Sequence, residues 1–339
     1  MIERPKAAVL GAGAWGTVFA MILRDAGNDV TMWSRRAEQA AEINAGTNHA
    51  YTGDHDLSGI RATTDVIEAV AGATIVAVTV PSSAVRSVVA AAAPAIGIDA
   101  SILSLVKGVE KDTLSFMTDV IVETLGCSPQ RVLAVSGPNL SAEIANKQPT
   151  GTVVAGLDPE RAGFVASRIH TGYFRPYVGD DIVGAEVGGV IKNIVAMAVG
   201  ACSGMNFGVN TRSFIINRGL TEMARLGVAL GARKETFLGL SGLGDLVATC
   251  SSELSRNFSF GYRLGQGMTV EQALAASSGT VEGARSCPNV LALAQRMSVI
   301  MPITEATQRV LDGDVDIETA AQRVFLSPRV TDSVDERAV

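Results

Sequence analysis

The sequence predicts an α/β domain with a doubly wound sheet, followed by an all-helical domain. Three observations predict this organisation. Short apolar runs alternate with helical segments in the first half of the chain, which is typical of a mainly parallel sheet. A glycine-rich turn joins the first apolar run to the first helix. After about Asp180 the strand-like runs stop, and helical periodicity continues to about Phe325. We therefore expect a Rossmann-like domain over residues 1–180, a helical domain over 181–328 and a polar tail over 329–339.

The apolar runs of the first domain give its expected elements. Strands are expected at Lys6–Leu10, Asp29–Trp33, Thr74–Val80, Ser101–Val106, Arg131–Val135, Gly151–Ala155 and Tyr173–Val178. Helices are expected at Thr17–Ala26, from Pro81 to about Ala93, at Thr113–Leu125 and near Glu160–His170. The polar stretch 44–60 contains two histidines and several aspartates. Its spacing matches no metal-ligand motif, and we expect a surface loop and no metal there.

Composition limits the classes of function. With 47% hydrophobic and 18% charged residues among 339, the chain has the balance of an ordered globular protein. A formal net charge of −6 argues against a nucleic-acid partner, because no basic face is visible. The four cysteines are widely separated, so neither a disulfide framework nor a zinc site is indicated. Arg86, Pro94 and Lys192 interrupt the most apolar runs and the N-terminus is unlike a signal peptide, so we expect no membrane span and a cytoplasmic protein.

The turn Gly11-Ala12-Gly13-Ala14-Trp15-Gly16 lies between the first expected strand and the first expected helix. Strand, glycine turn and helix are the context that makes this motif a strong indication of a dinucleotide site. Gly11 permits the tight turn, Gly13 lets a pyrophosphate approach the backbone, and Gly16 lets the helix lie close to the strand. The free amides of the helix start attract phosphate.

The end of the second strand indicates which dinucleotide binds. An NAD site usually has Asp or Glu there, whereas this chain has Ser34, Arg35 and Arg36. Arginine suits a 2′-phosphate, so we expect NADPH to be preferred and NADH to be possible. The alternative is that both arginines are simply the solvated start of the next helix.

Several polar residues interrupt apolar or glycine-rich segments. Lys192 lies in an apolar helix that includes Val187–Ala198, where a desolvated ammonium group could exchange protons near neutral pH or could extend to water. Lys107 and the segment from Ser136 to Asn139 follow predicted strands, at the edge where ligands of such sheets bind. In the helical domain, Asp245 lies in a glycine-rich break, and Ser255-Arg256-Asn257 begins a helix in the manner of an anion site.

These motifs, in this order, resemble the bacterial NAD(P)-dependent glycerol-3-phosphate dehydrogenases over nearly the whole chain. The matching stretches are Gly11–Thr17, Ser136–Pro138 with Glu143, Gly189–Asn193, Arg218–Gly227, Gly242–Cys250, Ser255–Asn257 and Val281–Gly283. The resemblance implies reversible reduction of dihydroxyacetone phosphate to sn-glycerol 3-phosphate, which feeds phospholipid synthesis. It also implies that the nicotinamide lies between the domains.

The resemblance also implies roles for single residues. Lys192 corresponds to the catalytic general acid and base, and Lys107 and Asp245 to residues at the reactive end of the substrate. The implied substrate-binding residues are Lys107, Gly137, Asn139, Lys192, Asp245, Ser255, Arg256 and Asn257. The implied cofactor-binding residues are Gly11, Gly13, Ala14, Trp15, Gly16, Arg35, Arg36, Tyr51, Lys107, Ser141, Arg256, Thr280 and Glu282.

Two other functions remain open at this point. One is a dehydrogenase of the same architecture that acts on a β-hydroxy acid or a sugar acid, and the segment Ser255–Asn257 argues for a phosphate ester instead. The other is a dinucleotide-sensing protein without turnover, which would not need Lys107, Lys192, Asp245 and Arg256 together. Apolar helical faces in the second domain make a homodimer the expected assembly.

Overall fold

The computed structural model describes residues 4–325, and the chain forms two compact units. The first unit, the sheet unit, comprises the residues up to Val106 together with Ser115–Ile182. The second, the helical unit, comprises Lys107–Leu114 and the residues from Val183 onward. The segment 107–114 therefore belongs to the helical unit although it lies between two parts of the sheet unit in the sequence. The expected polar tail 329–339 lies outside the described residues.

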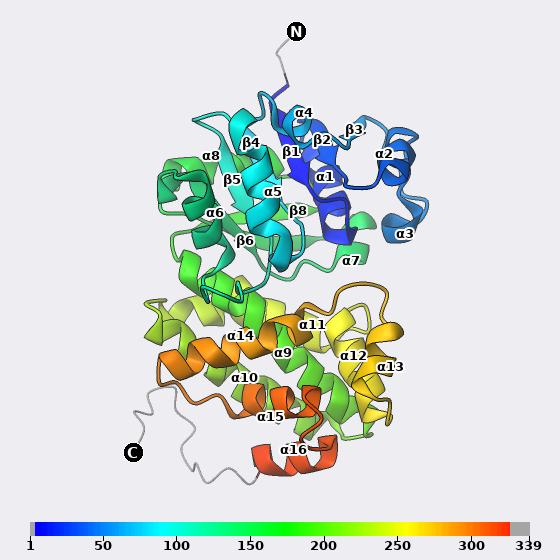
Figure 1. Ribbon diagram of the computed structural model, residues 1–339, viewed down its shortest axis with the longest axis vertical. Coiled ribbons are helices and arrows are strands. Elements are labelled where there is room, and N and C mark those ends of the chain that lie inside the picture. Colours follow the sequence, from blue (N-terminus) through cyan, green and yellow to red (C-terminus); the bar gives the residue numbers. More distant parts are fainter. Residues whose placement is uncertain (1–3, 326–339) are drawn as a thin grey trace. The chain divides into compact units, whose positions relative to one another are not determined.

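The sheet unit contains an eight-stranded sheet with the order β3-β2-β1-β4-β5-β6-β7-β8 (Figure 1). All neighbouring strands pair in parallel except β6 and β7, which are antiparallel. The strands are β1 (Lys6–Leu10), β2 (Asp29–Trp33), β3 (Ile60–Thr63), β4 (Ile75–Val78), β5 (Ser101–Ser104), β6 (Val132–Ser136), β7 (Thr150–Ala155) and β8 (Phe174–Gly179). The order reverses direction beside β1, so the carboxyl end of β1 lies at a topological switch point, where such sheets bind ligands.

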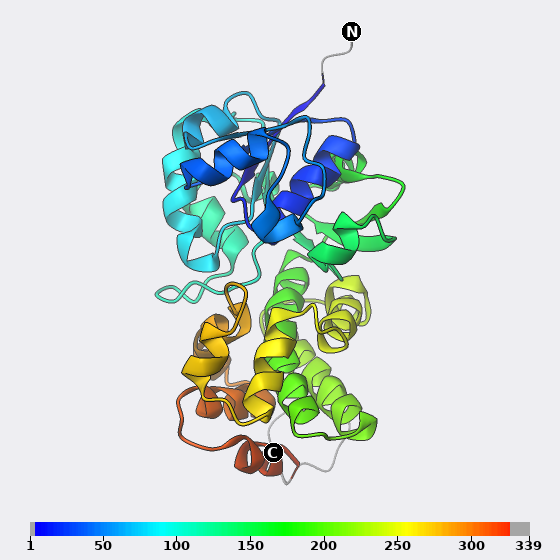
Figure 2. The ribbon, with the colours of Figure 1, turned by 90° about the vertical axis from the view of Figure 1, so that its right-hand side faces the viewer.

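Both faces of the central strands are buried. In β1, Ala7 and Val9 pack into one core with α1 (Ala14–Asp25) and α8 (Pro159–Ile169). Ala8 and Leu10 pack into a second core with α5 (Val85–Ala92) and α6 (Met117–Leu125). Figure 2 shows α5, in cyan, and α6, in blue-green, on the opposite side of the sheet from α1, in dark blue. Helices on both faces explain why these strands are continuously apolar rather than alternating. The predicted doubly wound α/β fold is confirmed.

The helices of the sheet unit connect these strands. They are α1 (Ala14–Asp25), α2 (Ala37–Asn44), α3 (His49–Thr52), α4 (Val66–Val70), η1 (Ser82–Ala84), α5 (Val85–Ala92), η2 (Ala93–Ala95), α6 (Met117–Leu125), η3 (Pro129–Arg131), α7 (Ser141–Ala145) and α8 (Pro159–Ile169).

Three local predictions were wrong. The helix expected from Thr113 begins only at Met117, because Leu114 has a positive φ of 58° that no helix accommodates. The polar stretch 44–60 is not all loop, since α3 lies within it. Strand β3 follows at its end and was not expected. Both elements have four residues, too few for a periodic pattern to identify.

The helical unit is built around one long apolar helix, α9 (Ile182–Gly204). The other helical segments are α10 (Val209–Ala229), η4 (Lys234–Leu238), η5 (Leu240–Gly244), α11 (Asp245–Cys250), α12 (Arg256–Gly265), α13 (Val270–Ala275), α14 (Glu282–Arg296), α15 (Pro302–Leu311) and α16 (Ile317–Phe325) (Figure 1). No strand is assigned between Val183 and residue 325, which confirms the predicted all-helical second part.

Helices α9 and α12 cross at very short range. A Cβ atom on Gly261 of α12 would lie 2.0 Å from the carbonyl oxygen of Met197 in α9, so only glycine fits there. This contact fixes the middle of α12 against α9. By length and hydropathy α9 could also cross a membrane, which the sequence analysis did not anticipate, but 83% of its most apolar window is buried within the protein.

Candidate active site

The glycine turn connects β1 to α1 at the switch point of the sheet. Gly11 has a φ of 122°, which only glycine adopts readily, and its N–H donates to the carbonyl of Trp33 at the end of β2. A Cβ atom on Gly16 would lie 2.1 Å from the carbonyl oxygen of Gly11. Gly16 therefore lets α1 start directly against the turn, as the sequence predicted.

The residues at the start of α1 fit a dinucleotide. A Cβ atom on Gly13 would meet nothing within 4 Å, so the backbone there is open to a ligand. Within the described part of the chain, no side chain caps the first turn, which contains Ala14 and Trp15. The indole N–H of Trp15 is shielded from solvent and has no acceptor among the described residues. Free amides and the positive end of the helix dipole suit a pyrophosphate at this point.

Arg35 and Arg36 follow β2, whose end is hydrogen-bonded to the glycine turn. Both arginines are exposed, and the backbone N–H of Arg36 donates to the hydroxyl of Ser34 at 3.3 Å. Tyr51 lies in α3 and is 38% exposed. Asn48, which precedes α3, donates to the hydroxyl of Thr17 in α1 at 2.8 Å, so α3 is fixed beside the start of α1. The arginines and Tyr51 thus belong to the same part of the sheet unit as the glycine turn.

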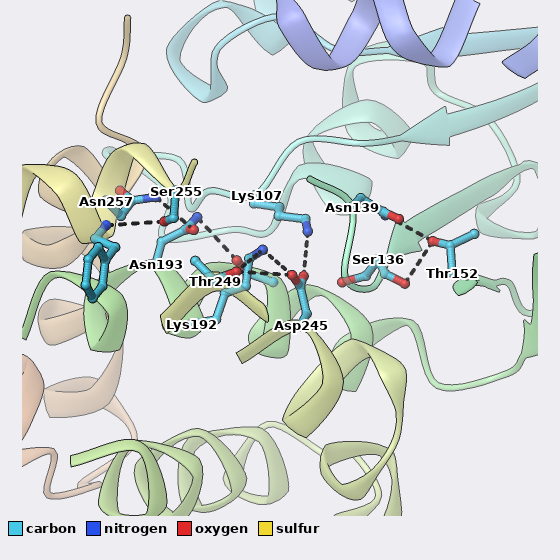
Figure 3. Close-up of polar contacts among 12 residues, drawn as sticks. Lys107, Ser136, Asn139, Thr152, Lys192, Asn193, Asp245, Thr249, Ser255 and Asn257 are labelled. Atoms are coloured by element: carbon cyan, nitrogen blue, oxygen red, sulfur yellow. Dashed lines mark hydrogen bonds and ion pairs between the residues drawn. The ribbon is translucent and has the colours of Figure 1, made fainter. Parts of the chain in front are cut away.

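A second polar group lies after β6 in the sheet unit. Gly137 has a φ of 152°, and a Cβ atom there would lie 3.1 Å from the Cα atom of Thr152. The amide of Asn139 donates to the Thr152 hydroxyl at 3.1 Å, and that hydroxyl donates to the Ser136 carbonyl at 3.2 Å (Figure 3). The Asn139 Oδ1 atom is buried and accepts no hydrogen bond within residues 4–325. Ser141, the implied cofactor contact, is the first residue of the short helix α7.

In the helical unit, Lys192 and Lys107 both bind the buried carboxylate of Asp245 (Figure 3). Lys192 of α9 donates to Oδ1 of Asp245, and Lys107 donates to Oδ2 at 2.6 Å. The side chain of Asp245 is 1% exposed and that of Lys192 is 8% exposed. Lys192 also donates to the hydroxyl of Thr249 at 2.9 Å. Asp245 begins α11 directly after the π-helical turn Leu240–Gly244, so it lies inside one continuous helical segment, Leu240–Cys250.

Electrostatics set the protonation of this cluster. Burial is the largest effect on Lys192 and lowers its pKa well below the usual value for lysine. The Asp245 carboxylate opposes this shift, and the positive charge of Lys107 adds to it. Lys192 is therefore an ammonium group that releases its proton more readily than an ordinary lysine, as proton transfer at neutral pH requires.

The residues of the predicted anion site lie at the start of α12, and two of them, Ser255 and Asn257, already have partners. The Ser255 hydroxyl caps the helix by accepting from the N–H of Phe258 at 3.2 Å. The side-chain amide of Asn257 donates to Oδ1 of Asn193 at 2.9 Å, and its oxygen accepts from the N–H of Gly283 at 2.9 Å. Asn193 follows Lys192 on α9, so these bonds hold the start of α12 next to the lysine cluster.

Arg256 is exposed at the same helix start. Its guanidinium lies beside Gly279, where a Cβ atom would come within 2.9 Å of a guanidinium nitrogen. Thr280 follows directly, and Glu282 is the first residue of α14. The helical unit therefore gathers Arg256, Thr280 and Glu282 in one region.

Two members of this site escaped sequence reasoning as ligand-site residues. Thr249 lies four residues after Asp245, a helical spacing that puts both side chains on one face, and this spacing could have identified it. Asn193 appeared in the sequence only as the end of the matching stretch Gly189–Asn193. Among the described residues, no group of three or more His, Cys, Asp or Glu side chains could hold a metal ion.

Comparisons with known proteins agree with this arrangement. Residues 6–162 match the family model "NAD-dependent glycerol-3-phosphate dehydrogenase N-terminus", and residues 181–322 match the corresponding C-terminus. The chain is 49% identical over 307 residues to the glycerol-3-phosphate dehydrogenase [NAD(P)+] of Streptomyces griseus, covering 90% of this chain and 91% of the relative. It is 48% identical over 314 residues to the enzyme of the same name from Corynebacterium aurimucosum, covering 92% and 95%.

A solved structure shows the same architecture. The crystal structure of glycerol-3-phosphate dehydrogenase from Coxiella burnetii has a TM-score of 0.91 and 36% identity to this chain, covering 96% of this chain and 99% of that one. With both family models matched in order along the sequence, this chain belongs to the NAD-dependent glycerol-3-phosphate dehydrogenase family.

Proposed function

We propose that this protein catalyses the reversible NAD(P)H-dependent reduction of dihydroxyacetone phosphate to sn-glycerol 3-phosphate, for glycerophospholipid synthesis. The observation that carries the proposal is the buried Lys192–Asp245–Lys107 cluster in a chain of this family. A sensor without turnover has no use for a buried lysine with a lowered pKa.

Lys192 is the general acid in the direction of reduction. Its ammonium group donates a proton to the carbonyl oxygen of the substrate, and in the reverse direction the neutral amine accepts the hydroxyl proton. Bound NAD(P)H supplies the hydride. The lowered pKa of Lys192 lets one side chain serve both directions near neutral pH.

Asp245 and Lys107 support this step. Asp245 holds Lys192 in position and keeps it charged until the proton moves. Lys107, bonded to the other carboxylate oxygen, stabilises the negative charge that develops on the substrate oxygen. Arg256 supplies the charge that binds the substrate phosphate, together with Ser255 and Asn257 at the start of α12. Gly137 and Asn139 provide further substrate contacts.

The glycine turn, including Gly13, Ala14 and Trp15, holds the pyrophosphate of the cofactor, and Arg35 and Arg36 select the 2′-phosphate of NADPH over NADH. The remaining cofactor contacts are proposed for Gly11, Gly16, Tyr51, Lys107, Ser141, Arg256, Thr280 and Glu282. We further propose that the protein works as a cytoplasmic homodimer, which sedimentation equilibrium would test.

The test is the initial rate of NADPH oxidation with dihydroxyacetone phosphate, with NADH measured in parallel. Rapid oxidation that is lost in Lys192→Ala supports the assignment. A folded protein that binds NADPH but oxidises neither cofactor would refute it, and β-hydroxy acids would then be the substrates to examine. A protein that oxidises NADH as well as NADPH would refute only the proposed cofactor preference.

A further inference from the structure

The carbonyl of Ala12, inside the glycine turn, is bound by two buried side-chain amides. Gln39 Nε2 donates to it at 2.7 Å, and Asn48 Nδ2 donates at 3.2 Å. Gln39 is 8% exposed and Asn48 is fully buried. A backbone carbonyl has two lone pairs, and both amide nitrogens lie closer to it than the third donor, the Thr17 hydroxyl, at 3.4 Å. Neither residue belongs to the ligand site described above.

The orientation of both amides is fixed by their partners. A carbonyl oxygen only accepts hydrogen bonds, so the atoms of Gln39 and Asn48 that face Ala12 must be nitrogens. The other ends agree: Gln39 Oε1 accepts from the Ser34 hydroxyl at 2.8 Å, and Asn48 Oδ1 lies 3.3 Å from Gln39 Nε2. Asn48 Nδ2 also donates to Thr17. The network is uncharged, buried and satisfied, which makes it rigid.

This network determines which way the next amide points. The C=O and N–H groups of a trans peptide point in opposite directions, and the described chain has no cis peptide. Because the Ala12 carbonyl points toward the buried amides, the N–H of Gly13 points away from them. That N–H has no acceptor in the described part of the chain, and the space beside Gly13 is open.

We propose that Gln39 and Asn48 are positioning residues for dinucleotide binding, which hold the Ala12–Gly13 peptide so that the Gly13 N–H donates to the cofactor pyrophosphate. The inference rests on the proposed function, since it presupposes a bound dinucleotide. Without these amides, the peptide could turn over and present its carbonyl to the phosphate, and that arrangement is repulsive. Both residues act through the backbone and do not touch the ligand themselves.

The same network extends to the segment that selects the 2′-phosphate. The Ser34 hydroxyl donates to Gln39 Oε1 and accepts from the N–H of Arg36. Gln39 thus connects the pyrophosphate site to the start of α2. Without Gln39, the Ser34 hydroxyl can still donate to the Arg36 carbonyl, 3.2 Å away. We therefore expect the loss of Gln39 to weaken the binding of ligands with a pyrophosphate far more than that of ligands without one.

The experiment compares Gln39→Met and Asn48→Leu, which keep side-chain size and remove the donors, with the wild type. Asn44→Ala is the matched control, because Asn44 lies on the same helix as Gln39 and its amide also binds backbone, donating to the Ala62 carbonyl at 2.9 Å. Three ligands are titrated: NADPH, ADP-ribose and adenosine 2′-monophosphate, which lacks the pyrophosphate. Melting temperatures of all variants report folding.

We expect Gln39→Met and Asn48→Leu to weaken the binding of NADPH and of ADP-ribose by about 10- to 100-fold. This is the effect of losing one charge-assisted hydrogen bond. Adenosine 2′-monophosphate should bind as it does to wild type, and kcat at saturating NADPH should be retained. Asn44→Ala should lower only the melting temperature.

Unchanged NADPH affinity in both variants would overturn the inference. An equal loss of affinity for all three ligands would also overturn the inference, because a general structural role would affect all of them alike. A wild-type protein that binds neither NADPH nor ADP-ribose would refute the proposed function itself. These results are distinguishable, since the first two require a wild type that binds.

Discussion

The role of Asp245 can be tested by replacing its carboxylate with an amide of the same shape. In Asp245→Asn, the two lysines that share the carboxylate lose their counter-charge, while one hydrogen-bond acceptor remains. Asp245 raises the pKa of Lys192, against the larger effect of burial. Its removal must therefore lower that pKa further.

The size of the change follows from the geometry. Two unit charges about 4 Å apart attract by about 4 kcal/mol at an effective dielectric constant of about 20, and the lysines lie closer than this. At about 1.4 kcal/mol per pKa unit, complete loss of this attraction would lower the pKa of Lys192 by about 3 units. Water that enters the site and the remaining amide dipole recover part of this. We expect a downward shift of about 1 to 3 units in the pKa of Lys192.

The assay is kcat/KM for dihydroxyacetone phosphate as a function of pH, followed by NADPH oxidation. Reduction needs the ammonium form of Lys192, so wild-type activity falls as pH rises through its pKa. In Asp245→Asn this fall should move to lower pH. Oxidation of glycerol 3-phosphate needs the neutral amine, so its acid-side rise should move to lower pH as well.

A matched control is Asp119→Asn, which makes the same change at a carboxyl on α6 in the sheet unit and should leave both profiles in place. If Asp245→Asn lowered kcat/KM at every pH without shifting the pH dependence of reduction or of oxidation, Asp245 would act on the substrate alone. The assignment of Asp245 as the group that keeps Lys192 charged would then be refuted.

Four further outcomes are expected. Lys192→Ala should abolish turnover, while the NADPH dissociation constant measured by fluorescence titration stays near that of wild type; a large loss of cofactor affinity would contradict the catalytic role. Arg256→Ala should raise the KM for dihydroxyacetone phosphate, because it removes one charge-assisted contact that contributes about 1.5 to 3 kcal/mol of binding free energy. An unchanged KM would show that Arg256 does not belong to the phosphate site. Arg35→Ala combined with Arg36→Ala should raise the KM for NADPH more than that for NADH, whereas equal losses would show that the arginines do not recognise the 2′-phosphate. Burial raises the pKa of the Cys250 thiol to about 12, so iodoacetamide at neutral pH should not label it in the folded protein; rapid labelling detected by mass spectrometry would show that α11 opens.

The fold was predictable where local sequence and tertiary packing agree. The strands β1, β4, β5 and β6 are largely apolar runs because both faces of the sheet are covered there, and this gives them a pattern that composition reveals. Strand β3 carries Arg61 at an edge of the sheet and has no such pattern. The segment 107–114 could not be assigned from sequence, because its association with the helical unit depends on contacts such as Asn289 donating to the Val109 carbonyl, 180 residues away.

The candidate site was predictable to a similar degree. A lysine in an apolar helix and an aspartate in a glycine-rich break each cost stability unless they have partners, so each stood out singly. The pattern of residues alone did not show that Lys192 and Asp245 are partners, since this depends on how α9 and α11 pack; only the family resemblance suggested that Asp245 could hold Lys192 in place. Gln39 and Asn48 could not have been found, because polar residues in a helix or a turn are ordinary in sequence. Only their convergence on the Ala12 carbonyl distinguishes them.

The charge balance of the helical site explains why a protein of formal charge −6 can bind an anionic substrate. Lys192 and Lys107 share one carboxylate, which leaves a net positive charge in a place where solvent is largely excluded. A second carboxylate would neutralise the cluster and remove the attraction for the developing oxyanion. Without Asp245, the two ammonium groups would repel each other and Lys192 would lose its proton before the substrate arrived. One carboxylate between two lysines is thus the arrangement that keeps a proton available for transfer and still leaves positive charge for the substrate oxygen.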